Sequence, residues 1–349
     1  MLGLHLLLFL APCLSHAQDY APPRYNFSLD LPPVQRWEAV LKNYNYREVT
    51  AAMDYMLDAT LPKWVHAIIR PLAEVELYFL VREPYAGEIK GIARTLGVNV
   101  GDVVALNLCY EATAFCTSII AQDDKGNIYH GRNLDYDFPD ILKKLTVDLD
   151  FVQNGKTVYT GTTFLGYVGL WTGQRPYQFT VSADARERGR ENWWKNAIAA
   201  FFERSSPVSW LMRDALNGDK DFETAAMRLS KTPIIAETYY IMAGTQSHEG
   251  LVITRNRNGP ADIWPLDPLT GEWFRVETNY DHWTTPPPDD DRRTPAIKAL
   301  NATGQANINI DTLYKVLSVK PVMNLITIYT TVMSAATPEN YKTQIRNGV

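Results

Sequence analysis

Apolar positions change their spacing near residue 115, and the change divides the chain into a helical part and a part rich in strands. Before it, apolar side chains recur every three or four positions, as on one face of an amphipathic helix. This spacing occurs in residues 37–56, 61–84 and 87–115, and the last stretch predicts two short helices. A proline-rich stretch, residues 21–33, precedes them and predicts an extended arm or linker.

A β-hairpin is predicted directly after this change. The run CTSIIAQD, which starts at Cys116, is rich in β-branched residues; the polar turn DDKGN and a second strand, IYHGRNLDYDF, follow it. With the turn centred on residues 124–126, position 122 faces 127 and position 133 faces Cys116. Directly opposed side chains on antiparallel strands have Cβ atoms ~5 Å apart. Arg132 is therefore predicted beside the thiol, and Asp135 just beyond the end of the pairing.

The remaining sequence predicts strands and helices in separate groups. Alternating residues and an Asn154-Gly155 turn predict antiparallel strands in residues 144–164 and 176–184. Four runs between residues 237 and 283 predict a meander, and residues 325–336 predict a last strand. Helical spacing is found in residues 189–205, 295–302 and 309–318. Because βαβ alternation is rare, we expect an α+β fold, in which two antiparallel sheets stack face to face and helices cover them.

The first 17 residues predict a secretory signal peptide. Residues 1–14 are apolar, and Ser15-His16-Ala17 gives the small-x-small pattern of a cleavage site. No later stretch reaches the ~18 continuous apolar residues of a membrane span. The sequons at Asn26 and Asn301 predict glycosylation and fit passage through the secretory pathway.

Composition and charge exclude several classes of function. The 349 residues carry a formal net charge of −5 without a basic stripe, which argues against nucleic-acid binding. The sequence has no Gly-rich phosphate loop and no G-x-S-x-G motif, and the four histidines beyond the leader lack metal-ligand spacing. We therefore expect no cofactor and no metal. Protonation of these histidines in an acidic compartment would bring the formal charge to about −1.

Two cysteines, Cys109 and Cys116, remain after removal of the leader, so a disulfide framework is not available. A thiolate is a nucleophile and needs a nearby cation or base to form. Cys116, with Arg132 and Asp135 across the hairpin, meets this requirement. The alternative is that Cys116 is a small buried apolar residue and Arg132 a surface charge.

Five motifs carry a resemblance to a known family. They are CTSIIAQD, HGRNLDYDF, GTTFLGYVGLWTG, RNGPADIWPLDP and RVETNYDHW. With these motifs the chain closely resembles the lysosomal acid amidases related to acid ceramidase, which are choloylglycine hydrolase-like N-terminal nucleophile hydrolases. The resemblance covers essentially the whole chain beyond the leader. It implies an αββα core and an inactive precursor that cuts itself between Phe115 and Cys116, giving a mainly helical α subunit (residues 18–115) and a β subunit (residues 116–349).

The same resemblance implies roles for individual residues. Cys116 matches the nucleophile, whose newly formed α-amino group is the base. Arg132 and Asp135 match the charged pair that holds this terminus, and Asn279 matches a side chain of the oxyanion hole. Arg292 matches a further active-site arginine, while Tyr136 and Trp171 fall in motifs near the substrate site.

Three positions keep alternative interpretations. Asn279 could be an ordinary turn residue, and Arg292, beside Arg293 in an acidic loop, could form a surface ion pair. The family has an acidic residue linked to activation just after FTVS, and the alignment does not decide between Ala185 and Glu187 for it.

The resemblance implies hydrolysis of N-acylethanolamines, such as palmitoylethanolamide, to fatty acid and ethanolamine in the lysosome. Alternatives are acid ceramidase activity on N-acylsphingosine, or a secreted lipid-binding glycoprotein without catalysis. Because the substrate is a membrane lipid, the apolar faces that carry Trp64, Ile68, Trp193 and Phe201 are expected to contact luminal membranes peripherally. Core packing is the alternative for the face that carries Trp64 and Ile68.

Overall fold

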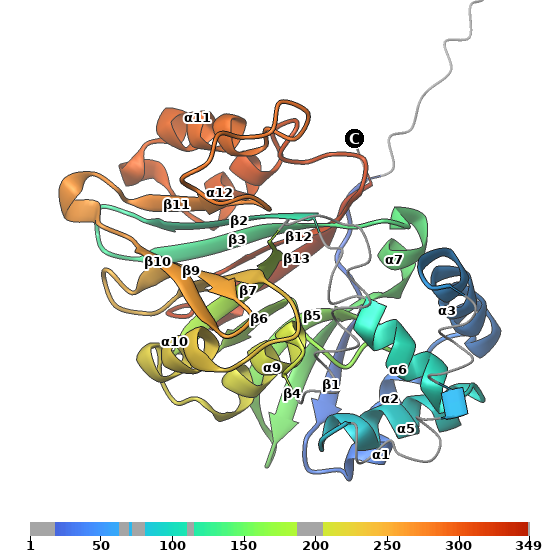
Figure 1. Ribbon diagram of the computed structural model, residues 1–349. Helices are drawn as coiled ribbons and strands as arrows, with labels where there is room; N and C mark the ends of the chain where they lie inside the picture. The colour runs from blue at the N-terminus through green and yellow to red at the C-terminus, as the bar shows by residue number, and fades with distance from the viewer. Residues whose placement is uncertain (1–17, 63–69, 72–80, 110–114, 187–204, 348–349) are drawn as a thin grey trace, which may run out of the picture.

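Two β-sheets stack face to face at the centre of the molecule, and helices cover their outer faces (Figure 1). The computed structural model describes residues 18–62, 70–71, 81–109, 115–186 and 205–347. In these residues the smaller sheet has the strand order β11 (Phe274–Glu277), β2 (Phe115–Gln122), β3 (Ile128–Asp135), β12 (Thr327–Met333) and β13 (Lys342–Ile345). The larger sheet has the order β1 (Arg24–Ser28), β4 (Thr146–Gln153), β5 (Lys156–Phe164), β6 (Thr172–Arg175), β7 (Phe179–Ala185), β8 (Thr238–Ala243), β9 (Gly250–Asn256) and β10 (Gly259–Pro265).

Helices complete the four layers. Helices α11 (Arg293–Thr303) and α12 (Ile310–Leu317) pack on the smaller sheet, and α9 (Val208–Gly218) and α10 (Phe222–Lys231) pack on the larger one. Short 3₁₀ turns are η1 (Pro268–Thr270), η2 (Gln305–Asn307) and η3 (Pro338–Asn340). The predicted αββα sandwich of the α+β class is confirmed.

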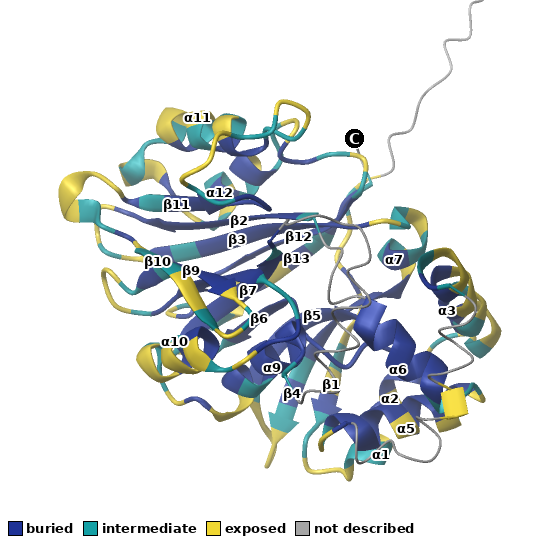
Figure 2. Ribbon diagram, in the orientation of Figure 1, coloured by how far each residue is buried: buried dark blue, intermediate teal, exposed yellow. Residues whose placement is uncertain are grey.

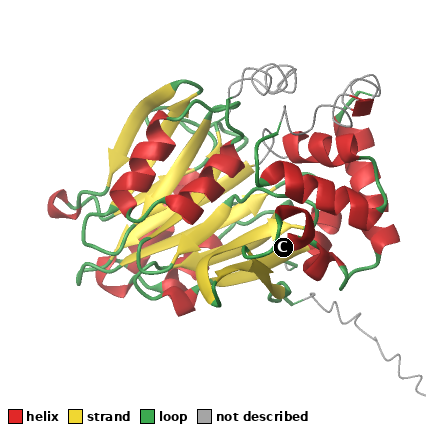
Figure 3. Cartoon of the chain, turned by 90° about the horizontal axis from the view of Figure 1, so that it is seen from below, coloured by secondary structure: helices red, strands yellow, loops and turns green. Residues whose placement is uncertain are grey.

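The N-terminal third is mainly helical, as predicted. Figure 3, seen from below, shows these helices grouped at one end of the strands. They are α1 (Pro33–Arg36), α2 (Glu38–Leu41), α3 (Tyr46–Thr60), α5 (Tyr85–Leu96) and α6 (Val100–Cys109). In the described part of the chain no single helix is long and apolar enough to cross a membrane, although α5 and α6, which meet at a 119° bend, pass that test as a pair.

The structure differs from the sequence-based prediction at two strands. The arm predicted for residues 21–33 contains β1, which pairs in parallel with β4 and buries Phe27 opposite Phe151. The fourth run of the predicted meander, β11, leaves the larger sheet and pairs with β2 in the smaller one. There it buries Val276 in the apolar cluster beneath α11 and α12. The sequence analysis also missed β6, β13, α9, α10 and α7 (Pro139–Leu145).

The β2–β3 hairpin forms as predicted, but its register differs by one residue. Gln122 pairs with Ile128, so Cys116 faces Leu134 and Ser118 faces Arg132. The turn is one residue longer than predicted because the Asp123 carboxylate accepts hydrogen bonds from the backbone N–H groups of Lys125 (2.9 Å) and Asn127 (2.8 Å). A slip of one residue moves every side chain to the other face of a strand. The observed register places Cys116 and Arg132 on the same face, whereas the predicted one would have separated them.

Both strands of this hairpin are central and buried on their two faces (Figure 2). On the outer face, α12 approaches β3 closely at Gly131, where a Cβ atom would lie 2.7 Å from Leu317 Cδ1. On the inner face, the hairpin packs against β7 and β8 of the larger sheet. Cys116 therefore lies between the two sheets.

Candidate active site

The thiol of Cys116 is fully buried and contacts one cation. Cys116 is the second residue of β2, and its side chain is 0% exposed. The Nη2 atom of Arg132, on the neighbouring strand, lies 2.6 Å from Cys116 Sγ. Burial raises the pKa of the Cys116 thiol strongly, while the charge of Arg132 lowers it and that of Asp184 raises it. The alternative of Arg132 as a surface charge is wrong, since Arg132 is 0% exposed.

Hydrogen bonds from the larger sheet hold the guanidinium of Arg132 in place. Its Nη1 atom donates to Trp171 O and to Thr172 Oγ1, both at 2.8 Å. Its Nη2 atom, besides meeting the sulfur, donates to Ala183 O at 3.3 Å and lies 3.4 Å from Asp184 Oδ1. The Nε atom has no partner among the described residues. The cation is thus shared between a thiol and a carboxylate.

Asp184 is a site residue that the sequence analysis missed. It is fully buried on β7, and Ser118 Oγ donates to its Oδ1 at 2.8 Å. Burial raises the pKa of Asp184 to about 7, against the opposing effects of Arg132 and the Ser118 hydroxyl. The sequence analysis left the family's acidic residue open between positions 185 and 187. The acid that this stretch brings to the site is instead Asp184, since Ala185 is apolar and Glu187 lies outside the described residues. The sequence contained one signal for Asp184: polar residues occupy alternate positions of the strand FTVSAD, which places Asp184 on the same face as Ser182.

Asp135 lies on the opposite face of β3 from Arg132. It is the last paired residue of the strand, opposite Phe115, so the prediction that it lies beyond the pairing was wrong. Asn324 Nδ2 donates to Asp135 Oδ2 at 3.0 Å, and Arg292 Nη1 lies 3.6 Å from the same oxygen. Burial raises the pKa of Asp135, and Arg292 opposes this shift. Arg132 and Asp135 each have a different charged partner.

Asn279 and Arg292 hold the backbone of Cys116. The N–H of Cys116 donates to Asn279 Oδ1 at 3.0 Å, and Arg292 Nη1 donates to Cys116 O. Arg292 Nη2 also donates to Asn279 Oδ1 at 2.7 Å, whereas Asn279 Nδ2 donates to Ala185 O at 2.7 Å. This network fixes the orientation of the amide. In the uncut chain Asn279 therefore presents its oxygen to residue 116.

Asn279 and Arg292 are both buried, and the predicted ion pair of Arg292 with the acidic loop forms from a buried guanidinium. Asn279 is 1% exposed and Arg292 is 2% exposed, so neither side chain lies at the surface. Arg292 does pair with a loop carboxylate, because its Nε and Nη2 atoms each lie 2.7 Å from an oxygen of Asp290. The Asp290 pair holds Arg292 in place next to Cys116.

A cavity of about 430 Å³ opens beside the Phe115–Cys116 bond. Its polar lining includes Asp135, Arg292 and Asn324, and Ile326 adds apolar surface. The cavity gives small molecules a route to the region where the chain is predicted to be cut.

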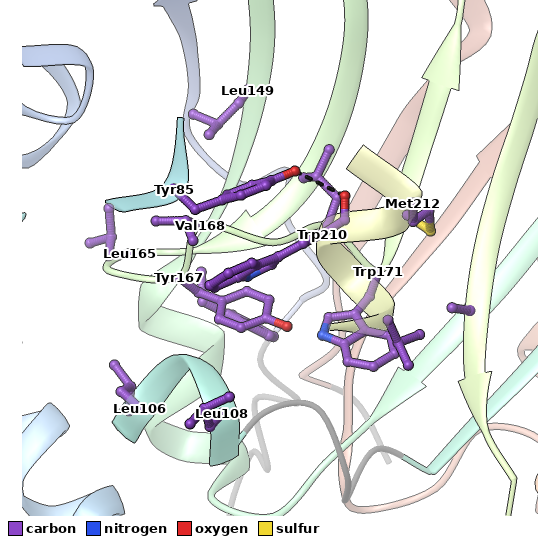
Figure 4. Close-up of a cluster of buried hydrophobic side chains, with 14 of the residues drawn as sticks. Tyr85, Leu106, Leu108, Leu149, Leu165, Tyr167, Val168, Trp171, Trp210 and Met212 are labelled. Carbon is purple, nitrogen blue, oxygen red and sulfur yellow. Dashed lines mark hydrogen bonds between the residues drawn. The ribbon is translucent and has the colours of Figure 1, made fainter. Parts of the chain in front are cut away.

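An apolar cluster adjoins the site on the side of the larger sheet (Figure 4). Trp171, whose carbonyl holds Arg132, is 3% exposed and lies in this cluster with Trp210 and Tyr167. Tyr85 stacks on Trp210 with ring centroids 4.5 Å apart. Tyr136 is also buried and donates from its hydroxyl to Cys109 O at 3.2 Å. Trp171 therefore adjoins the cysteine site, and the role of Trp171 and Tyr136 in binding substrate stays a prediction.

Several predicted features lie outside the described residues. They are the signal peptide and the four residues proposed to contact membranes: Trp64, Ile68, Trp193 and Phe201. The two sequon asparagines, Asn26 and Asn301, are both exposed, as glycosylation requires. Glycosylation itself stays a prediction.

Two stacked sheets between helical layers, with a cysteine at the start of a central strand, define the fold of an N-terminal nucleophile hydrolase. The family described as "Linear amide C-N hydrolases, choloylglycine hydrolase family" matches residues 116–294. The chain belongs to this family and is an amidohydrolase that acts on linear amide bonds. A second family, described as "beta subunit of N-acylethanolamine-hydrolyzing acid amidase", matches residues 20–78. This stretch lies in the part that the sequence analysis named the α subunit, so we refer below to an N-terminal and a C-terminal segment.

Named relatives agree with this assignment. The N-acylethanolamine-hydrolyzing acid amidase of Cavia porcellus is 58% identical, over 94% of this chain and 91% of the relative. The acid ceramidase of Homo sapiens is 37% identical, over 94% of this chain and 87% of the relative. Among solved structures, the Caenorhabditis elegans N-acylethanolamine-hydrolyzing acid amidase ortholog superposes with a TM-score of 0.62 at 40% identity. That match covers 66% of this chain and all of the solved one.

Proposed function

We propose that this protein hydrolyses N-acylethanolamines to fatty acid and ethanolamine, after cleavage of its own chain between Phe115 and Cys116 in the acidic lumen of the lysosome. The observation that carries the proposal is that two side chains contact Cys116: Arg132 contacts its sulfur, and Asn279 accepts a hydrogen bond from its nitrogen. The 58% identity to an N-acylethanolamine-hydrolyzing acid amidase supports this substrate class.

The proposed self-cleavage uses the thiol of Cys116 on the peptide bond that joins Phe115 to Cys116. Cys116 Sγ attacks the carbonyl carbon of Phe115, and the bond to the Cys116 nitrogen breaks. The nitrogen takes up a proton and becomes an α-amino group, while the acyl group forms a thioester on sulfur. Water then hydrolyses the thioester, which gives the carboxylate of Phe115 and restores the thiol. Asn279 Oδ1, which accepts the amide N–H before the cut, is placed to accept from the amine afterwards.

The uncut chain lacks a base for turnover, because the nitrogen of Cys116 is an amide. A thiol with an ordinary pKa of ~8.5 would be only ~0.03% ionised at pH 5. After cleavage the α-amino group lies on the same residue as the sulfur and can take its proton. The thiolate then attacks the substrate amide, ethanolamine leaves with the proton, and water hydrolyses the acyl-enzyme. This sequence explains why the precursor is inactive.

Buried contacts across the cleavage site support an enzyme of two associated segments. The N-terminal strand β1 is an integral strand of the larger sheet. Glu88 on α5 forms a two-pronged pair with Arg213 on α9, at 2.6 and 2.7 Å. A cut at residue 115 leaves all these contacts in place.

The test combines a gel, a terminal sequence and an assay. The secreted protein is incubated at pH ~4.5 and at pH 7.5, then analysed by SDS gel, Edman sequencing and turnover of palmitoylethanolamide. We expect two chains at the lower pH, with one that begins CTSII, and amidase activity that rises with it. A Cys116→Ala chain should remain whole and inactive. An intact wild-type chain after acid treatment would instead favour a lipid-binding glycoprotein.

The substrate class needs its own comparison, because acid ceramidase is also a relative. Turnover of palmitoylethanolamide and of a ceramide is measured side by side with the same activated protein. We expect a higher kcat/KM for the ethanolamide. A higher value for the ceramide would assign the protein to the other activity.

Membrane contact is part of the same proposal, because the substrate is a lipid. Replacing Trp193 and Phe201 with Ser should reduce activity on vesicles more than on detergent-solubilised substrate. Equal losses on both substrates would count against a membrane-facing role.

A further inference from the structure

A chain of buried hydrogen bonds runs from the site into the space between the two sheets. Ser118 Oγ lies 2.8 Å from Asp184 Oδ1 and 2.8 Å from Ser182 Oγ. Ser182 Oγ lies 2.9 Å from His130 Nε2, and His130 Nδ1 lies 2.9 Å from Thr180 Oγ1. All five side chains are 0% exposed. The chain ends at the carboxylate that shares Arg132 with Cys116.

The supply of protons restricts how this chain is arranged. Burial and, to a lesser extent, the charge of Arg132 lower the pKa of His130 to about 3, so the ring is neutral and carries one N–H. Each hydroxyl has one proton to donate. When Asp184 is ionised, Ser118 must donate to it, Ser182 to Ser118, and His130 Nε2–H to Ser182. Nδ1 is then the acceptor, and Thr180 donates to it.

Protonation of Asp184 at Oδ1 reverses the whole chain. The Asp184 hydroxyl then donates to Ser118, Ser118 to Ser182, and Ser182 to His130 Nε2. His130 carries its proton on Nδ1 and donates to Thr180. The hydroxyl of Thr180 is released for Ala243 O, which lies 3.3 Å away. Every donor in this second arrangement has an acceptor, so the chain accommodates the proton without adding a buried unsatisfied donor.

We propose that His130 is a positioning residue for Cys116: through Ser182 and Ser118 it stabilises the protonated form of Asp184 in acid, and this leaves the charge of Arg132 to the thiol. The inference rests on the proposed function, since it takes Cys116 as the nucleophile. Arg132 Nη2 is shared between Cys116 Sγ and Asp184 Oδ1, so loss of the carboxylate charge strengthens the remaining contact. In an acidic medium the Cys116 thiol thereby loses a neighbouring charge that raises its pKa.

Charged groups around Asp184 shift the pKa of its carboxyl in both directions. Arg132 on β3 and the more distant Arg292 favour the ionised carboxylate, while Asp135 disfavours it. Glu277 on β11, the neighbour of Ser118 across the strands, is buried and is itself raised in pKa by burial and by Asp184. Cys116 on β2 adds negative charge only when it ionises. Asp184 and Glu277 are thus two buried acids that raise each other's pKa, and Glu277 has its own cation, Arg293, at 3.8 Å. Their mutual repulsion favours a proton on Asp184 on acidification.

The tautomer of His130 is the direct readout. A full-length Cys116→Ala chain with ¹⁵N-labelled histidine is followed by NMR from pH 4.5 to 9, and the His130→Gln variant identifies the signal of His130. We expect the ring to stay neutral and to change from Nδ1–H at low pH to Nε2–H at high pH, with a single midpoint. A single tautomer over the whole range, or an imidazolium that titrates, overturns the proposal.

Two variants test the coupling. In Asp184→Asn the tautomer change should disappear; if it persists, Asp184 is not its source. In Ser182→Ala the protonated carboxyl loses the acceptor behind Ser118, so the pH midpoint of self-cleavage should move about one unit lower. Ser334→Ala, which removes a buried hydroxyl that donates to Ile128 O, is the matched control and should leave the midpoint unchanged. An equal shift in both variants overturns the proposal.

Self-cleavage by Cys116 and the hydrogen-bond chain from His130 to Asp184 are tested by different results. If the Cys116→Ala chain still separates into two chains on a gel, the proposed function fails whatever the NMR shows. If that chain stays whole but His130 does not change its tautomer, only the relay fails.

Discussion

Two buried ion clusters in this molecule contain the same kinds of groups but differ in how completely these groups are bonded. At the junction of the segments, both oxygens of Glu88 accept from Arg213, and Arg36 and Trp37 add further donors. Every nitrogen of Arg213 has an acceptor as well, including Val168 O at 2.7 Å and the Tyr159 hydroxyl at 3.3 Å. We call this cluster closed, because every charged atom of Glu88 and Arg213 has a hydrogen-bond partner.

The cluster at Cys116 is incomplete by comparison. Arg132 Nε, Asp184 Oδ2 and Asp135 Oδ1 are buried without a hydrogen-bond partner among the described residues. Buried polar groups in native proteins are nearly always paired, so each exception needs an explanation. Unpaired atoms also occur elsewhere in the described residues, for example at Arg255 Nε and Arg346 Nη1. The two clusters are alike in burial and charge, and they differ in that only the one at Cys116 leaves atoms of its charged groups without hydrogen bonds.

The largest effect is expected at the incomplete cluster. In Arg132→Lys the single ammonium cannot reach the sulfur, Trp171 O and Thr172 Oγ1 together. We expect self-cleavage and amidase activity to fall by ~10³-fold or more, with little change in the thermal unfolding midpoint. Rates from gels and assays, with the midpoint from calorimetry, check this. A large loss of stability would make Arg132 a structural residue like Arg213.

The closed cluster should show the opposite pattern. Glu88→Gln leaves the charges of Arg213 and Arg36 buried without a carboxylate. We expect the free energy of unfolding to fall by about 3–5 kcal/mol, while the specific activity of the folded fraction is kept. Urea unfolding and active-site titration measure the two quantities. Unchanged stability would contradict the structural role.

A pH series on Asp184 sharpens the comparison. The folded-state pKa of Asp184, about 7, lies above its unfolded value of ~3.9, so its contribution to stability is full below pH ~4 and is lost as the pH rises to about 7. Asp184→Asn should remove this contribution, on the order of 4 kcal/mol at most. Urea midpoints at pH 4.5 and 7.5 should then differ less than in the wild type. Asp148, whose pKa burial also raises to about 7, retains part of the dependence in both proteins.

The smallest effect is expected at the surface. Arg94 and Glu38 lie 3.9 Å apart with more than half of each side chain exposed. Arg94→Ala should change the free energy of unfolding by less than about 0.5 kcal/mol and leave activity unchanged. It gives the baseline against which the Glu88 variant is read.

Sequence patterns predicted much of the candidate site. The change of spacing at residue 115, the hairpin and the motif HGRNLDYDF predicted Cys116, Arg132 and Asp135 on one hairpin, although the predicted register put Cys116 and Arg132 on opposite faces. Asp184 escaped prediction because it lies 68 residues beyond Cys116 on a strand of the other sheet, and only the stacking of the sheets brings it to Arg132. The register escaped because the side chain of Asp123 sets the length of the turn.

What the sequence determined by itself is local: the period of its apolar residues, the positive-φ turn at Asn154-Gly155, and a cysteine at the head of a β-branched run. What only the tertiary structure decided is which buried charges find complete sets of partners. Glu88 and Arg213 lie 125 residues apart in the sequence, and only the packing of α5 against α9 brings them together. Local preferences act over a few residues, whereas desolvation penalises each charge according to everything that surrounds it, and this environment exists only after the sheets have stacked.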